Sequence, residues 1–228
     1  MRTTILAVIS ILFAATGCVS LGRDTPPLEQ YVLGSTPPAA EAASANASGV
    51  AVGLRRLDLT PYLASPSIVV RRGVNQITVS EYHRWGEDPV AGINRAVARY
   101  LRAAPQVRAV DVAPWAVRSP HDFVVQLHVS RFEGAAPADS LAVEGEAHLL
   151  ASWEIHRPRD GGLLARGTID YRAEGWPLGD YPALVTLLDG GLSRMASQIA
   201  ACMARVGPAA DLTSPQAAAA TALPLACT

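Results

Sequence analysis

The sequence predicts a mixed α/β domain in which a largely antiparallel sheet is covered by two main helices. Apolar residues recur every three or four positions over 89–104 and again over 182–206, which is the period of an amphipathic helix. Over 141–155 and 163–173 apolar and polar residues instead alternate, which is the period of a half-buried strand. A chain of 228 residues fits one such domain with appended segments.

The first 17 residues have the organisation of a signal peptide. Arg2 supplies a positive charge, and an apolar run follows from Ile5 to Ala15, too short to span a bilayer as a helix. The run leads into Thr16-Gly17-Cys18, which resembles the bacterial lipoprotein signal, in which the cysteine becomes the lipidated first residue. The alternative is an ordinary cleaved signal peptide with an incidental cysteine. By the same resemblance, Val19 after the cysteine implies the periplasmic face of the outer membrane.

Composition divides the rest of the chain into three parts. Residues 18–30 are polar and contain two adjacent prolines, as expected of a lipidated tether. The folded domain is expected over 31–206, interrupted by a flexible loop at 34–49 that is rich in Ala, Ser and Pro. Residues 207–228 are dominated by Ala, Pro and Thr and are expected to be a disordered tail.

The first predicted helix has clear start and stop signals. Asp88 suits the N-cap, Pro89 suits the first turn, and Pro105 ends the helix near Ala104. Six further strands are expected at Tyr31–Leu33, Val50–Leu59, Ile68–Arg72, Gln76–Val79, Val107–Val112 and Phe123–Phe132.

The strands at 141–155 and 163–173 should pair as a hairpin. Leu141 and Val143 are expected on the inward face of the first strand, and His148 on its outward face. Both apolar faces are odd-numbered, so either an odd-length loop, such as three residues with a left-handed Gly, or a bulge must keep them in phase.

Two cysteines remain if Cys18 carries lipid. Cys202 falls near the end of the second helix and Cys227 in the tail. They either form a disulfide, which would persist in an oxidising compartment and hold the tail down, or stay as free thiols.

The residue patterns that carry catalysis or metal binding are missing from this sequence. His148 and His156 share a strand face but are eight residues, roughly 26 Å, apart, too far to share an ion. Glu144 and Glu146 fit an exposed, charged strand face better than a catalytic pair. No nucleophile elbow, phosphate-binding loop or dinucleotide fingerprint occurs. A net charge of −1 gives no electrostatic case for nucleic acid. We therefore expect no cofactor, no metal and no enzymatic activity.

Arg84 and Trp85 form the single aromatic–cation pair that reads as exposed. Trp and Arg are enriched at binding hot spots, so the pair is a candidate partner-binding patch. The alternative, which we favour, is that Trp85 packs beneath the start of the helix.

Several of these segments resemble one family in the same order along the chain. After the lipoprotein cysteine come Tyr31-Val-Leu, then Leu59-Thr-Pro-Tyr62-Leu63, then Ser65-Pro-Ser-Ile-Val-Val-Arg71, then Arg84-Trp85-Gly-Glu-Asp-Pro89. Together they resemble the ABC-type transport auxiliary lipoproteins of the PqiC type. The sequence departs from the family pattern at Gly86, where Ala is usual, and at Asp88-Pro89.

The resemblance implies a fold of the anticodon-binding-like kind and lipidation of Cys18. It implies a non-enzymatic outer-membrane subunit of an MCE/ABC-type lipid transport system, with a periplasm-spanning MCE-domain protein as partner, and a ring-forming homo-oligomer. Tyr62, Leu63, Arg84 and Trp85 carry the family motif. The alternative is a stand-alone lipoprotein that binds a small apolar ligand or an envelope component.

Overall fold

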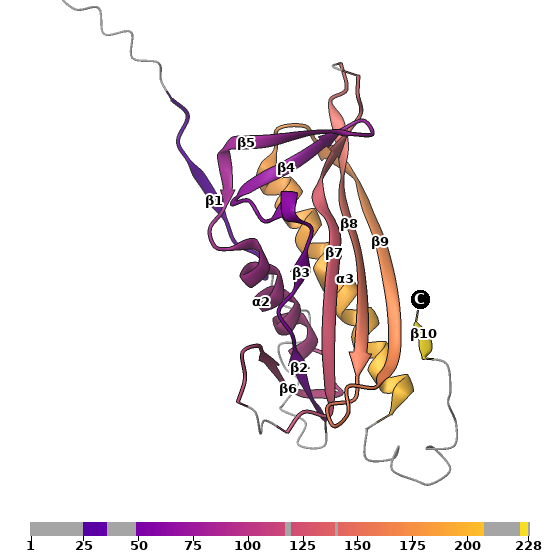
Figure 1. The fold of residues 1–228 in the computed structure, drawn as a ribbon. Coiled ribbons are helices and arrows are strands. Elements are labelled where there is room, and N and C mark those ends of the chain that lie inside the picture. The colour runs from indigo at the N-terminus through magenta and orange to yellow at the C-terminus, as the bar shows by residue number, and fades with distance from the viewer. Residues whose placement is uncertain (1–24, 36–48, 117–119, 140, 208–223, 228) are drawn as a thin grey trace, which may run out of the picture.

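The computed structural model describes residues 25–35, 49–116, 120–139, 141–207 and 224–227 (Figure 1). In chain order the elements are β1 (Glu29–Tyr31), β2 (Val50–Leu54), β3 (Asp58–Leu59), the 3-10 turn η1 (Pro61–Leu63), β4 (Ser67–Arg72), β5 (Gln76–Trp85), α2 (Pro89–Arg102), β6 (Val107–Val112), β7 (Phe123–Ala136), β8 (Glu144–His156), β9 (Leu163–Pro177), α3 (Tyr181–Val206) and β10 (Leu225–Cys227).

Three long antiparallel strands, β7, β8 and β9, form the centre of a ten-stranded sheet. The β4–β5 hairpin joins β7 through a parallel pairing of β4, and β1 extends that side by pairing with β5. β2 and β3 lie parallel to β7, and β6 lies parallel to β2. The domain is therefore the predicted mixed α/β fold, with an antiparallel centre and short parallel additions.

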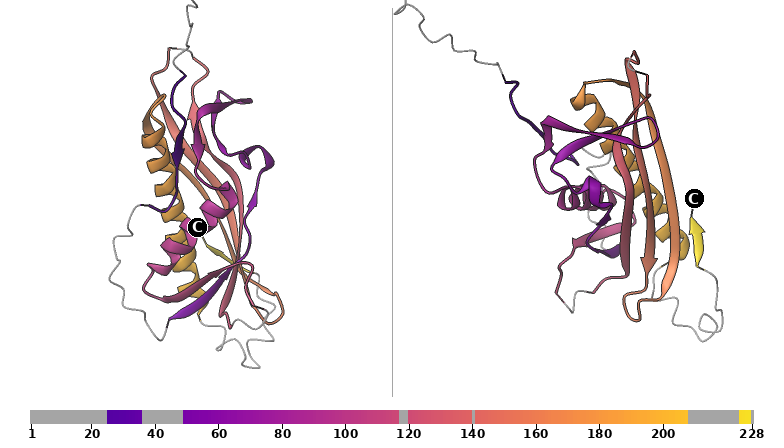
Figure 2. Two further views of the ribbon diagram at one scale, coloured as in Figure 1. Left: turned by 90° about the vertical axis from the view of Figure 1, so that its left-hand side faces the viewer. Right: turned by 45° about the horizontal axis from the view of Figure 1, so that its top comes forward.

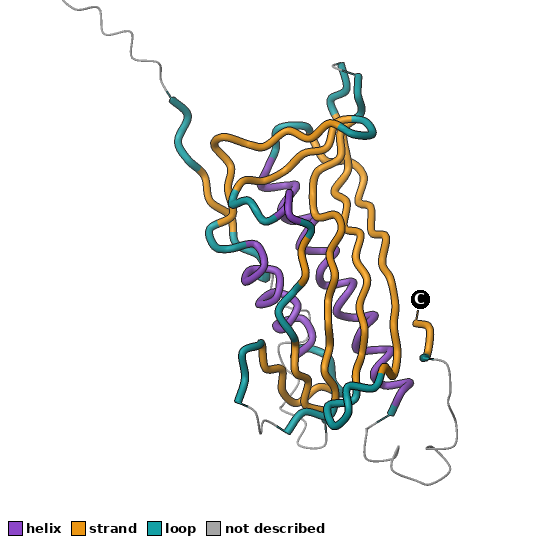
Figure 3. Tube along the Cα trace, viewed as in Figure 1, coloured by secondary structure: helices purple, strands orange, loops and turns teal. Residues whose placement is uncertain are grey.

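Both helices lie on one side of this sheet (Figures 2 and 3). α3 runs along β7–β9, and its apolar face, which includes Leu188 and Leu192, is fully buried. α2 packs beside α3 and over β6. The carboxylate of Asp189 links these parts, because it accepts hydrogen bonds from the Tyr100 hydroxyl at 2.6 Å and from the Gly34 amide at 2.8 Å.

The two predicted helices are confirmed within two residues at each end, because the period of their apolar faces locates both and the predicted Asp88 cap locates the start of α2. The Asp88 carboxylate accepts from the Ala91 amide at 3.0 Å, and Asp180 caps α3 in the same way through Ala183. The strand expected at 31–33 instead occupies 29–31, so the folded part begins inside the segment expected to be a tether. The strand expected at 50–59 is divided into β2 and β3.

Three residues of the predicted hairpin lie differently from the expectation. Leu141 and Val143 are 83% and 77% exposed, because β8 begins only at Glu144 and these residues lie in the loop before it. His148 is 1% exposed, although it lies on the outward face. In register it lies between Glu133 and Arg172, and its Nε2 atom lies 2.8 Å from Asp170 Oδ1. The outer face of the sheet thus buries a polar cluster at this point.

The β8–β9 pairing keeps the two odd-numbered faces together. Ile155 lies opposite Ala165 and Trp153 opposite Gly167, and a shift at Ile155/His156 separates these pairs from the loop. Of the two expected ways to keep the faces in phase, an odd-length loop or a bulge, the chain uses the bulge. The three-residue loop is wrong, because residues 157–162 form the connection.

Within the segment 207–228, expected to be a disordered tail, residues 225–227 instead form the strand β10. β10 pairs in parallel with Ala165–Gly167 of β9, and Cys202 and Cys227 form a disulfide with a Cα–Cα distance of 5.9 Å. Gly167 leaves room for this pairing, because a Cβ there would meet Trp153 at 2.2 Å and the Cys227 carbonyl oxygen at 2.4 Å. Residues 208–223, the signal region 1–17 with Cys18, and most of the 34–49 loop lie outside the described residues.

Candidate functional site

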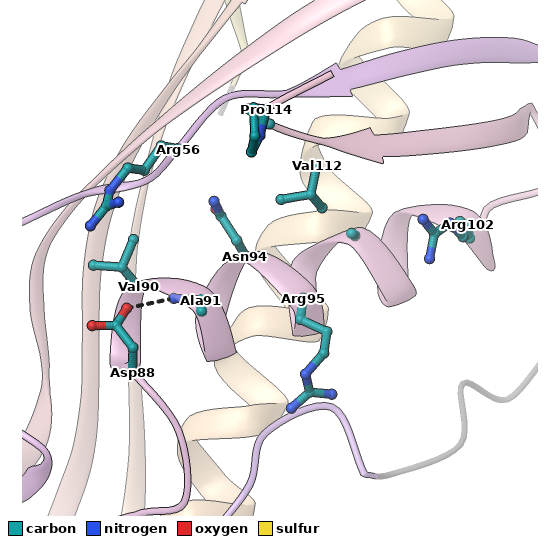
Figure 4. Close-up of a pocket in the computed structure, with 11 residues that line it drawn as sticks. Arg56, Asp88, Val90, Ala91, Asn94, Arg95, Arg102, Val112 and Pro114 are labelled. Carbon is teal, nitrogen blue, oxygen red and sulfur yellow. Dashed lines mark hydrogen bonds between the residues drawn. The ribbon is translucent and has the colours of Figure 1, made fainter. Parts of the chain in front are cut away.

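A pocket of about 550 Å³ lies between α2 and the segments that cross above it (Figure 4). One wall is formed by one face of α2, and the other by the β2–β3 connection, the end of β6 and the segment after it. Its lining residues are Arg56, Asp88, Val90, Ala91, Asn94, Arg95, Ala98, Arg102, Val112, Ala113 and Pro114.

Helical spacing explains how α2 supplies one wall. Ala91, Arg95, Ala98 and Arg102 follow one another at intervals of three or four residues, and Asn94 lies three residues after Ala91 and four before Ala98, so all five lie on one face of the helix. This stripe differs from the apolar stripe that packs into the core. The break between β2 and β3 places Arg56 opposite it.

Asn94 is the unusual polar group in this pocket. Its side chain is 3% exposed, and its Nδ2 atom donates to the Arg55 carbonyl oxygen at 3.2 Å. Its Oδ1 atom has no hydrogen-bond partner within the described part of the chain. A buried acceptor left unpaired costs roughly 1–3 kcal/mol, which the surrounding packing must offset.

The remaining lining residues add apolar walls and basic character. Val90, Val112 and Pro114 are apolar, and Arg56, Arg95 and Arg102 bring guanidinium groups. Arg95 bonds to Glu87 and to the Leu33 carbonyl oxygen, and Arg102 bonds to the Val110 carbonyl oxygen. The hydrogen bond of Arg95 to Glu87 raises the pKa of the guanidinium, against the opposing effect of burial. Asp88, the carboxylate in the lining, is occupied as the helix cap. This arrangement suits binding of a small amphiphile rather than acid–base chemistry.

A second polar cluster lies on the outer face of the sheet. The Glu133 side chain is fully buried, and its Oε1 atom lies 2.6 Å from Arg71 Nε. The Tyr62 hydroxyl donates to Glu133 Oε2 at 2.8 Å and accepts from Arg71 Nη2 at 3.1 Å. Arg131 lies at the edge of the cluster, 4.0 Å from Glu133.

Burial and hydrogen bonds shift the pKa values of Tyr62, Arg71 and Asp170 in and beside this cluster. Burial first, and the hydrogen bond to Glu133 second, raise the pKa of Tyr62. The hydrogen bond to Glu133 raises the pKa of Arg71 despite partial burial. For Asp170, burial acts to raise the pKa, but the bonds from His148 and Arg172 outweigh it, so the pKa is lowered. Tyr62 therefore stays neutral and Arg71 stays charged at neutral pH.

The four family-motif residues do not gather in a single surface patch. Leu63 and Trp85 are buried, and the Trp85 ring lies 5.6 Å from the Phe132 ring. Tyr62 belongs to the Glu133 cluster described above. Arg84 alone is exposed, on β5 opposite Gln30 of β1. Three of the four residues thus stabilise the fold, and Arg84 faces solvent.

Sequence reasoning did not single out Asn94, Arg71 or Glu133. A polar residue beside the apolar residues of α2 was the available signal for Asn94. Glu133 lay just beyond the predicted end of its strand at Phe132, and its burial depends on Arg71 from a distant segment.

Neither a metal site nor a membrane-crossing helix occurs among the residues that the structure describes. No group of three His, Cys, Asp or Glu side chains there could hold a metal ion. Neither helix in that part of the chain combines the length and apolar content that crossing a bilayer requires.

Two solved structures share this fold, and a third aligns with a lower score. Protein XCC0632 from Xanthomonas campestris, assigned to family DUF330, superposes with a TM-score of 0.60 at 15% identity, covering 80% of this chain and 93% of that one. An uncharacterized protein superposes with a TM-score of 0.56 at 16% identity, covering 77% and 98%. PelC from Paraburkholderia phytofirmans gives 0.40 at 17% identity, covering 67% and 91%. No curated protein matches the chain in sequence.

Comparison with family models identifies the family itself. The model described as ABC-type transport auxiliary lipoprotein component matches residues 31–200, which is more than half of the chain and includes both helices almost entirely. The chain therefore belongs to the family of ABC-type transport auxiliary lipoprotein components.

Proposed function

We propose that this protein is a non-enzymatic outer-membrane lipoprotein subunit of an MCE/ABC-type system that transports lipids between membranes. Cys18 carries the lipid anchor, the domain lies on the periplasmic face, and the protein contributes to envelope integrity. The observation that carries this proposal is the family match over residues 31–200. The partner is a periplasm-spanning MCE-domain protein, and the subunit assembles as a homo-oligomeric ring.

Purification from native membranes tests this function. The tagged protein would be isolated in mild detergent, and its partners identified by mass spectrometry, beside a Cys18→Ser variant that cannot be lipidated. We expect an MCE-domain protein to be enriched with the wild type, and its absence from repeated preparations would refute the transport role. The intact mass of the wild type reports lipidation, and the native mass of the complex reports the number of subunits.

Arg84 offers a sharper test of the partner surface. It is the exposed member of the family motif, so Arg84→Glu should reduce recovery of the MCE-domain partner without loss of folding. Arg159→Glu, at the exposed β8–β9 turn, makes the same charge change elsewhere and serves as the matched control. Equal recovery with both variants would remove Arg84 from the interface.

The pocket between α2 and the segment after β6 favours a second candidate function, binding of a small amphiphile. Its volume of about 550 Å³ and its apolar walls support it. Ala91 is an exposed position that lines the pocket, so Ala91→Trp would fill the pocket without disturbing the core. Ala201→Trp, at an exposed position of α3, is the control. Native mass spectrometry should detect a bound small molecule in the wild type and the control but not in Ala91→Trp.

A further inference from the structure

Large apolar side chains are exposed where two hairpins meet at one end of the domain. Val74, in the β4–β5 turn, is 82% exposed, and Leu141 and Val143, in the β7–β8 loop, are 83% and 77% exposed. Ile77 and Val79 of β5 add partly exposed apolar surface next to the turn. We call these five residues the hairpin tip. Several large apolar side chains exposed at one end of a domain favour an interaction site over ordinary solvent exposure.

The two hairpins are fixed to each other, so the hairpin tip is a defined surface. The Gly73 amide donates to the Ala136 carbonyl oxygen at 3.0 Å, and Arg72 pairs in register with Ala136. Gly73 has a φ of 59°, and a Cβ there would lie 3.2 Å from the Ala138 Cβ. The other side of the loop is held by the Leu178 amide, which donates to the Val143 carbonyl oxygen at 2.9 Å.

The start of the described chain lies at the same end of the domain. In Figures 1 and 2 the segment 25–28 leaves β1 toward the end where both hairpin loops lie, opposite the β8–β9 turn. Cys18 precedes Thr25 by seven residues, which span at most about 25 Å when fully extended. A membrane anchor on Cys18 therefore keeps the chain entrance, and with it this end of the domain, near the bilayer.

We propose that the hairpin tip is a second membrane contact, which rests in the interfacial layer of the bilayer that holds the Cys18 anchor. This inference depends on the lipidation of Cys18 in the proposed function. The apolar side chains would enter the boundary between head groups and acyl chains, while Arg72 and Glu144, exposed at the base of the loops, stay in the head-group layer. The contact would fix the orientation of the domain, with the β8–β9 turn pointing away from the membrane.

A fluorescent probe placed in the full-length, lipidated protein tests this contact. Cys202 and Cys227 are paired and Cys18 is acylated, so Leu141→Cys introduces the one thiol open to an environment-sensitive dye. Val74→Cys repeats the measurement on the other hairpin, and Arg159→Cys at the opposite end is the control. The labelled proteins would be reconstituted into vesicles of phosphatidylethanolamine and phosphatidylglycerol with or without spin-labelled lipid.

The expected result is blue-shifted emission at 141 and 74, with quenching by spin-labelled lipid about twofold or more above that at 159, because interfacial groups lie only roughly 5–10 Å deep. Quenching no greater than at 159 overturns the inference. A blue shift without lipid quenching also overturns it, since a protein surface would then cover the tip. Intact mass and vesicle flotation are measured on the same samples. A chain that lacks lipid and does not float contradicts the proposed anchor itself, whereas a lipidated, floating chain with an unquenched tip contradicts only this inference.

Discussion

The guanidinium of Arg71 and the carboxylate of Glu133 form an ion pair beneath the outer surface of the sheet, with Nε 2.6 Å from Oε1 and the Glu133 side chain fully buried. The two residues come from strands that are 62 positions apart in sequence. A carboxylate in this position is tolerated only while its partners remain, so the pair joins the β4–β5 hairpin to the central strand β7.

Removing the cation should therefore be costly. Arg71→Met leaves Glu133 buried without its main partner, and we expect a loss of about 3–5 kcal/mol in the free energy of unfolding. Urea denaturation at neutral pH measures it. Arg108→Met is the matched control, because its 3.2 Å pair with Asp122 is more than a third exposed on both sides and should contribute less than about 1 kcal/mol. Equal losses in the two variants would contradict the role assigned to the buried pair.

Tyr62 should stabilise the same cluster in a pH-dependent way. Tyr62→Phe removes the hydrogen bond to Glu133, with an expected loss of about 1 kcal/mol at pH 7. Folding raises the pKa of the phenol above its ordinary value of 10.0, so this contribution is complete below pH 10 and declines as the pH rises toward the folded-state pKa. The wild type should therefore be more stable than Tyr62→Phe at pH 7, and this difference in unfolding free energy should shrink above pH 10. A constant difference would show that the hydroxyl does not titrate as inferred.

The neighbouring motif residues Arg84 and Trp85 should behave in opposite ways. Trp85→Ala removes a buried ring that packs on Phe132, and we expect a loss of about 3–5 kcal/mol in unfolding free energy. Arg84→Ala changes an exposed side chain and should stay within about 0.5 kcal/mol of the wild type. Thermal and urea unfolding of the two variants separate a packing role from a surface role. A stable Trp85→Ala protein would return this residue to the candidate interface.

The disulfide should contribute through the loop that it closes. Cys202 and Cys227 are 25 residues apart, and a cross-link over that length stabilises a fold by about 3 kcal/mol. Cys227→Ser should lower the midpoint of urea unfolding, and a reducing agent should lower that of the wild type to a similar value. The variant itself should not respond to the reducing agent, which provides the internal control.

The parts of the fold that sequence predicted well are those governed by local spacing. α2 and α3 carry their apolar stripes and their Asp caps within one segment, so their ends could be placed closely. Leu141 and Val143 were misplaced, and the burial of His148 on the outward face was missed, because alternation alone does not say where a strand begins or what covers its outer face. The burial of His148 depends on Glu133 and Arg172 in the two flanking strands.

The candidate pocket was beyond sequence reasoning for a related reason. It brings together Arg56, Asn94 and Pro114, which belong to three segments that meet only through the packing of α2. Asn94 lies inside a well-predicted helix, but its burial and its unpaired oxygen follow from the β2–β3 connection that packs against it.

The short strand β10 has a consequence for where the protein can complete its fold. An unpaired sheet edge is a template onto which other chains can add, and β10 covers part of the outer edge of β9 with only three residues. A strand of that length is held in place by the covalent link of Cys227 to Cys202, and such links persist in oxidising compartments. Oxidation of Cys202 and Cys227 therefore holds β10 on the edge of β9 and protects that edge from aggregation. The protection of the β9 edge thus depends on the redox state of the surroundings.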